Sequence, residues 1–268
     1  MSQALANPSF NKQSNVLQKM LPHLNSAELN EIETVTLRHY DDHAQSFWEG
    51  TKDHDVTQNH EAFLSACLPG KSLDLLDFGC GPGRDIKHFK ALGHRPVGLD
   101  GSTEFCRLAR RYTQCPILQQ SFLDLELPKA GFDGIFANAS LFHVPSQALP
   151  GVLNELHDAL RPGGILFSSN PRGNDEGWQG QRYGHYMELE ASQSYLKAAD
   201  FEILHHYYRP ADKPRHEQPW LAIVSRSVNR ETNESPPTGS VGSGVIADNK
   251  STDPQQLGHA PEATHLLH

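Results

Sequence analysis

Residues 73–83 read LDLLDFGCGPG, a short apolar run that ends in three glycines at every second position. A run such as Leu73–Phe78, followed by glycines, is typical of a strand buried in the middle of a sheet. Glycine has no Cβ, so it adopts positive φ easily and lets a ligand approach the backbone. A helix is expected at Arg84–Leu92, closed by Gly93. This order of strand, glycine loop and helix predicts a nucleotide-binding site.

The rest of the central region alternates between strand and helix patterns. From residue 46 to residue 226 the alternation predicts an α/β fold, in which helices cover a parallel sheet. The predicted strands are Pro96–Leu99, Ile117–Gln119, Gly134–Asn138 and Ile165–Ser169, with Phe201–Tyr207 and Trp220–Ser225 paired as an antiparallel edge. The predicted helices are Thr103–Tyr112 and the amphipathic segment Gln147–Leu160, which Arg161-Pro162-Gly163-Gly164 stops before a turn.

Composition limits the classes of protein to which the chain can belong. The 268 residues are 37% hydrophobic, and no run approaches the roughly 20 apolar residues that a membrane-spanning helix needs. The formal net charge of −9 argues against a large nucleic-acid surface. The four cysteines show no CxxC spacing, and no signal peptide precedes them. We therefore expect reduced thiols and a cytoplasmic location.

Three regions follow from these patterns. Residues 1–38 are expected to be an N-terminal extension with helices, and residues 39–226 to form the main α/β domain. Residues 227–268 are rich in Ser, Pro, Gly, Thr and Asn and show no hydrophobic period, which predicts a disordered tail.

The glycine spacing narrows the choice of nucleotide. A dinucleotide fingerprint needs G-x-G-x-x-G, whereas here the third glycine comes one residue early and position 84 is Arg. Gly70-Lys71-Ser72 is not a phosphate loop, because Ser65 occupies the required earlier glycine position. Asp100 ends the second predicted strand, where a carboxylate accepts hydrogen bonds from both hydroxyls of an unphosphorylated ribose. The alternative places Asp100 in a helix N-terminal region with Ser102 as the cap.

Taken together, these landmarks resemble the class I S-adenosylmethionine-dependent methyltransferases. They are Asp77-x-Gly-x-Gly-x-Gly, Asp100, Phe132-Asp133 at the fourth strand and Leu160-Arg161-Pro162-Gly163-Gly164 before the fifth. The resemblance covers roughly Tyr40 to Arg226. It implies a Rossmann-like, doubly wound, seven-stranded sheet that is mostly parallel with an antiparallel last strand, in a three-layer α/β/α arrangement. It also implies S-adenosylmethionine as cofactor and S-adenosylhomocysteine as product.

The resemblance further implies where the cofactor binds. The glycine loop would hold the methionine part, Asp100 the ribose, and the segment after the third strand the adenine. The expected cofactor-binding residues are Tyr40, Trp48, Thr51, Asp77, Gly79, Cys80, Gly81, Asp100, Gly101, Ser121, Phe122 and Asn138.

Two parts of this expected site need comment. The family usually has Asp where this chain has Ser121, and a Ser hydroxyl is a shorter acceptor for the adenine amino group. Upstream, an aromatic face suits a sulfonium cation, and we expect either Phe47 or Trp48, but not both, to contact the ligand. Thr51 is a candidate to bond the methionine carboxylate.

Candidates for the chemistry follow the fourth and fifth strands. His143 is the best-placed titratable group and a candidate base, with a structural histidine as the alternative. The polar and aromatic loop from Asn170 to Tyr186 predicts a substrate lid, with a solvated loop as the alternative. In it, Arg172 or Arg182 would clamp a carboxylate and Tyr183 would orient the acceptor. Asn138 cannot supply a metal carboxylate, so no metal is expected.

The sequence thus predicts a methyltransferase that acts on an N, O or S atom of a small polar metabolite. No nucleic-acid or membrane partner is expected. A tRNA or protein methyltransferase is the first alternative, and the acidic charge disfavours it. A non-catalytic adaptor that keeps the fold is the second, and the intact glycines and Asp100 argue against it.

Overall fold

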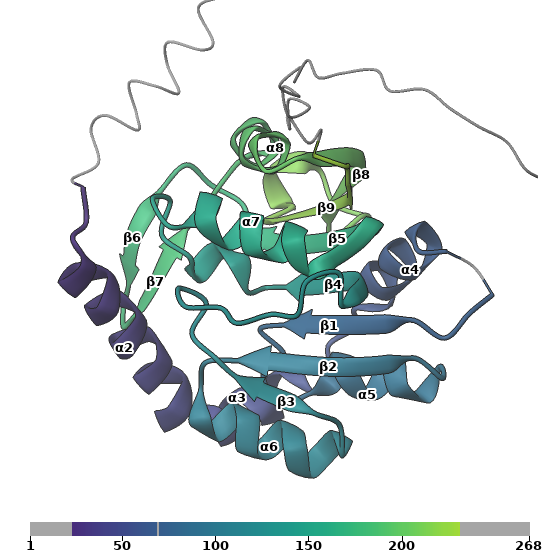
Figure 1. Ribbon diagram of the computed structural model, residues 1–268. Coiled ribbons are helices and arrows are strands. Elements are labelled where there is room, and N and C mark those ends of the chain that lie inside the picture. Colours follow the sequence, from purple (N-terminus) through teal and green to yellow (C-terminus); the bar gives the residue numbers. More distant parts are fainter. Residues whose placement is uncertain (1–22, 69, 231–268) are drawn as a thin grey trace, which may run out of the picture. The chain divides into compact units, whose positions relative to one another are not determined.

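A seven-stranded sheet forms the centre of the computed structural model, which describes residues 23–68 and 70–230. The strand order is β3-β2-β1-β4-β5-β9-β8 (Figure 1). The first five strands in this order pair in parallel, and β9 is antiparallel to both of its neighbours. The strands are β1 (Asp74–Phe78), β2 (Arg95–Asp100), β3 (Ile117–Gln119), β4 (Phe132–Asn138), β5 (Leu160–Pro171), β8 (Phe201–Arg209) and β9 (Trp220–Ser227). The predicted doubly wound sheet with a reversed last strand is confirmed.

Helices cover both faces of the sheet. One layer contains α4 (Thr57–Ala66), α5 (Arg84–Ala91) and α6 (Thr103–Thr113), and the other contains α7 (Leu149–Ala159) and α8 (Leu189–Ala198). Side chains alternate along β1, so Leu75 packs with Phe63 and Phe89 while Leu76 packs with Leu153 on the other face. Because helices bury the sheet on both sides, a ligand has access only at its ends.

The helix α2 (Ser26–Asp42) precedes the sheet and begins at a capping box. The Asn25 side chain accepts from the backbone N–H groups of Ala27 and Glu28, and the Glu28 carboxylate accepts from the Asn25 N–H. The short helix α3 (Ala44–Thr51) follows. The predicted boundary between residues 38 and 39 lies inside α2.

A β-hairpin occupies the segment that we expected to be an irregular lid loop. Strands β6 (Glu176–Gln179) and β7 (Arg182–His185) pair antiparallel, with Trp178 opposite Tyr183. Gly180 opens the two-residue turn with a φ of +65°, which such hairpins favour at that position. The expectation of an irregular loop was therefore wrong. The hairpin contacts α2 through β7, and Figure 1 shows the two side by side.

The start of β5 also differs from the sequence prediction. Helix α7 does end before Arg161, but Leu160 already pairs with Phe132 of β4, and a register shift follows before Ile165. The predicted turn residues therefore lie within an irregular first part of the strand. At the other end of the chain, the tail predicted for residues 227–268 begins too early, because Ser227 still belongs to β9 and Arg230 forms ion pairs with Asp158 and Asp200. The rest of the predicted tail, from residue 231 onward, lies outside the described residues.

None of the described helices combines the length and the apolar character required to cross a membrane.

Candidate active site

A cavity of about 610 Å³ opens at the carboxyl ends of the parallel strands. This is the edge at which open α/β sheets bind ligands. Helices α2 and α3 form the opposite wall. The predicted site residues that line the cavity are Tyr40, Trp48, Thr51, Gly79, Cys80, Gly81, Asp100, Gly101, Phe122, Asn138 and His143. The predicted residues absent from its lining are Asp77, Ser121, Arg172 and Tyr183.

The glycine loop follows β1 and forms the floor of the cavity. Gly79 has a φ of +76°, and a Cβ there would lie 2.3 Å from the Cβ of buried Ser140. Gly79 is therefore required both by its backbone conformation and by the segment after β4 that passes beside it. Ser140 lines the cavity, and its buried hydroxyl has no hydrogen-bond partner among the described residues. It is available to a ligand.

Asp77 lies beneath this loop rather than in the cavity. It is 1% exposed, and its Oδ2 has no partner in the described part of the chain. Burial, together with the nearby carboxylate of Asp85, raises the pKa of Asp77 well above its ordinary value. Asp77 therefore supports the loop from below.

Asp100 ends β2 and faces the cavity. Its Oδ2 accepts from the Gly81 N–H at 2.9 Å, and its Oδ1 accepts from the Ser102 N–H at 2.9 Å. Each oxygen keeps a further lone pair for a ligand hydroxyl. Burial raises the pKa of Asp100 to about 6, against the lowering effect of the two backbone donors. Ser102 caps α6 as expected, by accepting from the Phe105 N–H.

An aromatic wall faces the glycine loop. The rings of Tyr40 and Phe47 both pack on Phe105, with centroids 5.4 and 5.0 Å away. Trp48 packs against Tyr112 at 4.8 Å. Both Phe47 and Trp48 line the cavity, so either ring is in reach of a ligand, and the prediction that only one of them contacts it remains a prediction. Such a surface of ring faces suits a cation.

Thr51 and Asn138 bring polar groups to the same end of the cavity as Cys80. The Thr51 hydroxyl donates to the Phe47 carbonyl at 2.7 Å, so its remaining lone pair accepts rather than donates. The Asn138 Oδ1 accepts from Asn59 at 2.9 Å, and the Tyr207 hydroxyl donates to Asn59 in turn. This chain of bonds orients the Asn138 amide group so that its NH₂ can donate into the cavity. No sequence pattern points to Asn59, because its role depends on tertiary contacts of α4 with Asn138 of β4 and Tyr207 of β8.

Tyr40 and His143 form the most clearly defined pair in the site. The Tyr40 hydroxyl lies 2.7 Å from His143 Nε2, and His143 Nδ1 lies 2.7 Å from the Tyr183 carbonyl oxygen. A carbonyl can only accept, so Nδ1 carries the proton and Nε2 accepts from the Tyr40 hydroxyl. Burial lowers the pKa of His143 to about 4, so the ring is neutral at physiological pH.

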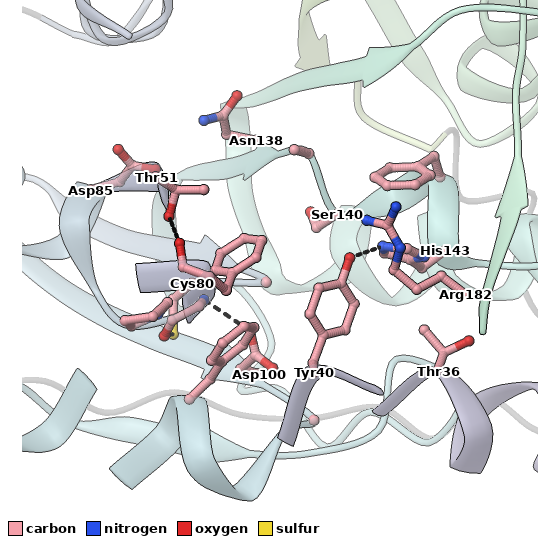
Figure 2. A pocket seen from close by; sticks show the side chains of 18 of the residues that line it. Thr36, Tyr40, Thr51, Cys80, Asp85, Asp100, Asn138, Ser140, His143 and Arg182 are labelled. Carbon is pink, nitrogen blue, oxygen red and sulfur yellow. Dashed lines mark hydrogen bonds between the residues drawn. The ribbon is translucent and has the colours of Figure 1, made fainter. Parts of the chain in front are cut away.

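Arg182 completes this end of the cavity. It extends from β7, hydrogen-bonds the Tyr40 side chain and lines the cavity. Figure 2 shows Arg182 and His143 on one side of Tyr40, with Asp100 and Cys80 on the other. In the described ranges 23–68 and 70–230, Arg182 makes no ion pair with a carboxylate. Its charge is therefore available to an anionic ligand.

The other two predicted catalytic residues lie elsewhere. The Arg172 side chain forms an ion pair with Glu188 at 3.0 Å and donates to the carbonyls of Arg215 and Gln218. The Tyr183 hydroxyl donates to Glu176 at 3.1 Å. Arg172 therefore joins two segments of the fold, and Tyr183 acts on the site only through its backbone carbonyl.

Ser121 also does not reach the cavity. Its hydroxyl donates to the carboxylate of Glu33 on α2 and accepts from the Leu123 N–H at 2.9 Å. Glu33, which the sequence reasoning missed, does line the cavity. Among the residues that the structure describes, no cluster of His, Cys, Asp or Glu could hold a metal ion.

Parts of the chain are similar to known proteins. A family model described as "Methyltransferase domain" matches residues 75–164. Sterol 24-C-methyltransferase of Debaryomyces hansenii is 22% identical over 184 residues, which cover 60% of this chain and 48% of that protein. Trans-aconitate 2-methyltransferase of Azoarcus sp. is 38% identical over 106 residues, which cover 38% of this chain and 40% of that protein. The chain thus spans about half or less of the length of these curated relatives.

A solved structure shares the fold over most of both chains. The 1,6-didemethyltoxoflavin-N1-methyltransferase of Burkholderia thailandensis, solved with 1,6-didemethyltoxoflavin and S-adenosylhomocysteine bound, superposes with a TM-score of 0.62. The two chains are 22% identical, and the match covers 78% of this chain and 93% of that chain.

Proposed function

We propose that the chain transfers a methyl group from S-adenosylmethionine to a small polar acceptor, and its match to a methyltransferase domain over residues 75–164 supports this. This proposal rests on one observation. The carboxylate of Asp100, placed where it can accept from ribose hydroxyls, and the Tyr40–His143 pair, which can accept a proton, face the same cavity. Asp100 and the glycine loop form one side of that cavity, and Tyr40, His143 and Arg182 form the other.

The residues present fit this cofactor. Asp100 retains two acceptor sites for the ribose hydroxyls, and the glycine loop leaves room for the methionine part. Because the Thr51 hydroxyl donates to Phe47, it would accept from the ammonium group of the cofactor rather than bond its carboxylate as expected from the sequence. The Asn138 amide and the unpartnered Ser140 hydroxyl would supply donors. When bound, the cofactor supplies an electrophilic methyl group on a sulfonium centre.

Tyr40 and His143 can take the proton that an acceptor hydroxyl, amine or thiol gives up. The acceptor donates its proton to the Tyr40 oxygen, and the Tyr40 hydroxyl proton moves to His143 Nε2 over 2.7 Å. The Tyr183 carbonyl holds Nδ1–H throughout, so the ring keeps its orientation. Burial keeps His143 neutral, so Nε2 is free of a proton at neutral pH, but its pKa of about 4 also makes it a weak base. The relay therefore suits an acceptor whose own proton becomes acidic as the methyl group is transferred.

Arg182 supports a narrower class of acceptor, one that carries an anionic group. Its guanidinium lies beside the Tyr40 oxygen, so an anion bound there holds the acceptor atom close to the proton relay. One of the relatives is named for an organic acid, trans-aconitate. A sterol-like acceptor fits less well, because the half-buried guanidinium of Arg182, which has no carboxylate partner among the described residues, disfavours apolar groups at this end.

Calorimetric titration of the full chain with S-adenosylhomocysteine tests the cofactor first. Labelled S-adenosylmethionine is then incubated with small organic acids and with their neutral amides. We expect transfer to acids, and we expect Arg182→Gln to raise KM for them about ten-fold or more while leaving S-adenosylhomocysteine affinity unchanged. The exposed Arg226→Gln is the matched control.

Three results would contradict the proposal. Failure to bind S-adenosylhomocysteine would remove the cofactor. Binding of the cofactor without transfer to any small molecule of a cell extract would favour the non-catalytic adaptor. Strongly salt-dependent RNA binding would instead favour a tRNA methyltransferase.

A further inference from the structure

The cavity extends beyond Asp100 toward the end of β3. In the sheet order β3-β2-β1, the glycine loop follows β1, Asp100 ends β2, and the segment Gln120–Leu123 follows β3. A nucleotide laid across these strand ends, with its ribose at Asp100, therefore has its base beside β3.

Helix α2 covers this end of the cavity. A Cβ on Gly101 would lie 2.8 Å from the Leu37 side chain, so α2 passes directly over the residue that follows Asp100. Glu33 lies one turn before Leu37 on the same helix face, and both line the cavity together with Ile32. The apolar side chains Ile32, Leu37 and Leu123 form a slot of the kind that suits a planar base, with one carboxylate at its edge.

Ser121 fixes the position of that carboxylate. The Ser121 hydroxyl has a single proton, which it donates to Glu33 Oε1, and it accepts from the Leu123 N–H. Ser121 does not line the cavity, so its groups serve Glu33 and the local backbone rather than a ligand. For the second oxygen of Glu33, Oε2, residues 23–68 and 70–230 provide no hydrogen-bond partner.

We propose that Glu33 accepts the hydrogen bond from the exocyclic amino group of adenine and so selects adenine over a purine with a carbonyl at that position. This inference rests on the proposed function, since it places the base of the cofactor in the slot. A carboxylate has only acceptors, so it binds an amino group and repels a carbonyl oxygen. The role that the family gives to a residue after the third strand passes here to a residue of α2, with Ser121 as the residue that positions it.

Binding measurements test this assignment without any turnover. S-adenosylhomocysteine and S-inosylhomocysteine differ at this one position, where the first has an amino group and the second a carbonyl. We expect the full-length protein to bind S-adenosylhomocysteine at least about ten-fold more tightly than S-inosylhomocysteine. Only the adenine compound can donate a hydrogen bond to the charged Glu33. In Glu33→Gln, whose amide also offers donors, the ratio of the two affinities should fall toward one.

Two variants serve as comparisons. Glu31→Gln changes an exposed carboxylate on the same helix and should keep the wild-type ratio. Ser121→Ala removes the donor to Glu33 and should lower the ratio only in part. Because the readout is a ratio within each folded protein, a general loss of stability does not imitate the effect.

The outcomes separate this inference from the proposed function. If the wild type binds S-adenosylhomocysteine but Glu33→Gln keeps the full preference, or if the wild type has no preference, Glu33 is not the acceptor and the proposed function stands. If Ser121→Ala alone abolishes the preference, Ser121 is the acceptor instead. If the wild type binds neither compound, the proposed function fails and the inference fails with it.

Discussion

At the scale of single residues, His143 shows how the backbone decides the chemistry of a side chain. The Tyr183 carbonyl fixes the proton on Nδ1, and burial keeps the ring uncharged. The two interpretations of this histidine, as a base and as a structural residue, therefore do not exclude each other. His143 closes the turn after β4 and still offers an acceptor, Nε2, to Tyr40.

His143 should make the stability of the fold depend on pH. Its pKa falls from 6.5 when unfolded to about 4 in the folded protein. The contribution is therefore fully present above pH 6.5 and is lost as the pH falls through the folded value. We expect the wild type to lose about 2 kcal/mol more unfolding free energy than His143→Gln between pH 7 and pH 5.

Urea denaturation at both pH values measures this difference. His216→Gln, at an exposed site, is the control and should follow the wild type. Equal pH dependence in His143→Gln and the wild type would show that His143 is not buried as a neutral ring.

The sequence predicted those site residues whose positions follow from the strand in which they lie or which they directly follow. Gly79, Gly81 and Asp100 lie within or directly after strands that pattern alone identifies, so their meeting at one edge follows from parallel pairing. Glu33 and Arg182 could not be placed in this way. Each depends on where α2 and the hairpin pack, and that is a property of tertiary contacts rather than of local pattern.

At the scale of elements, the glycine loop depends on the segment that follows β4 as much as on its own flexibility. Gly79 and Gly93 both have positive φ, of +76° and +85°. A Cβ at Gly79 would overlap Ser140, whereas no atom lies within 4 Å of a Cβ at Gly93. The two positions thus differ in packing and not in backbone conformation.

Replacement of each glycine by alanine should separate these two effects. Gly93→Ala should cost about 1–2 kcal/mol, the strain of a left-handed residue, and leave S-adenosylhomocysteine binding unchanged. Gly79→Ala should cost about 2 kcal/mol more, through overpacking against Ser140, and should weaken binding. Thermal unfolding and calorimetry measure both quantities, and equal losses in the two variants would contradict the packing argument.

The hairpin β6–β7 was missed although part of its signal is present in the sequence. Gly180-Gln181 is a two-residue connection between short runs, and Trp178 and Tyr183 pair across it. The runs are only four residues each, which is too short for alternation to stand out from a polar loop. By contrast, the strand Ile117–Gln119 was predicted with the bounds that the structure has. The helix before it and the strand after it along the chain were already assigned, which left little room for other bounds.

At the scale of the whole molecule, α2 is the element that joins the two halves of the cavity. It contacts β7 on one side and α6 on the other, and the Tyr183 N–H donates to Thr36 on its inner face. Its residues reach both the end of β3 and the Tyr40–His143 pair. Ligand binding should therefore stabilise α2 more than helices that lie away from the cavity.

Hydrogen exchange tests this expectation. On addition of S-adenosylhomocysteine, amides of Ser26–Asp42 should exchange at least several-fold more slowly, because opening of α2 then requires release of the ligand. Amides of α8 (Leu189–Ala198) contribute nothing to the cavity and should not change. Unchanged exchange in α2 with the ligand bound would show that the helix does not close over it.

The spacing along α2 has a consequence for which sequence changes the protein can accept. Glu33 and Tyr40 are seven residues apart, almost two full helical turns, so they share a face and lie roughly 10 Å apart along the axis. The helix thus fixes the distance between the two ends of the cavity. Substitutions on its outer face leave the spacing between Glu33 and Tyr40 unchanged. The insertion of one residue between these positions would rotate one of them about 100° out of the cavity. Between Glu33 and Tyr40 the helix must therefore keep its length as well as the side chains that line the cavity.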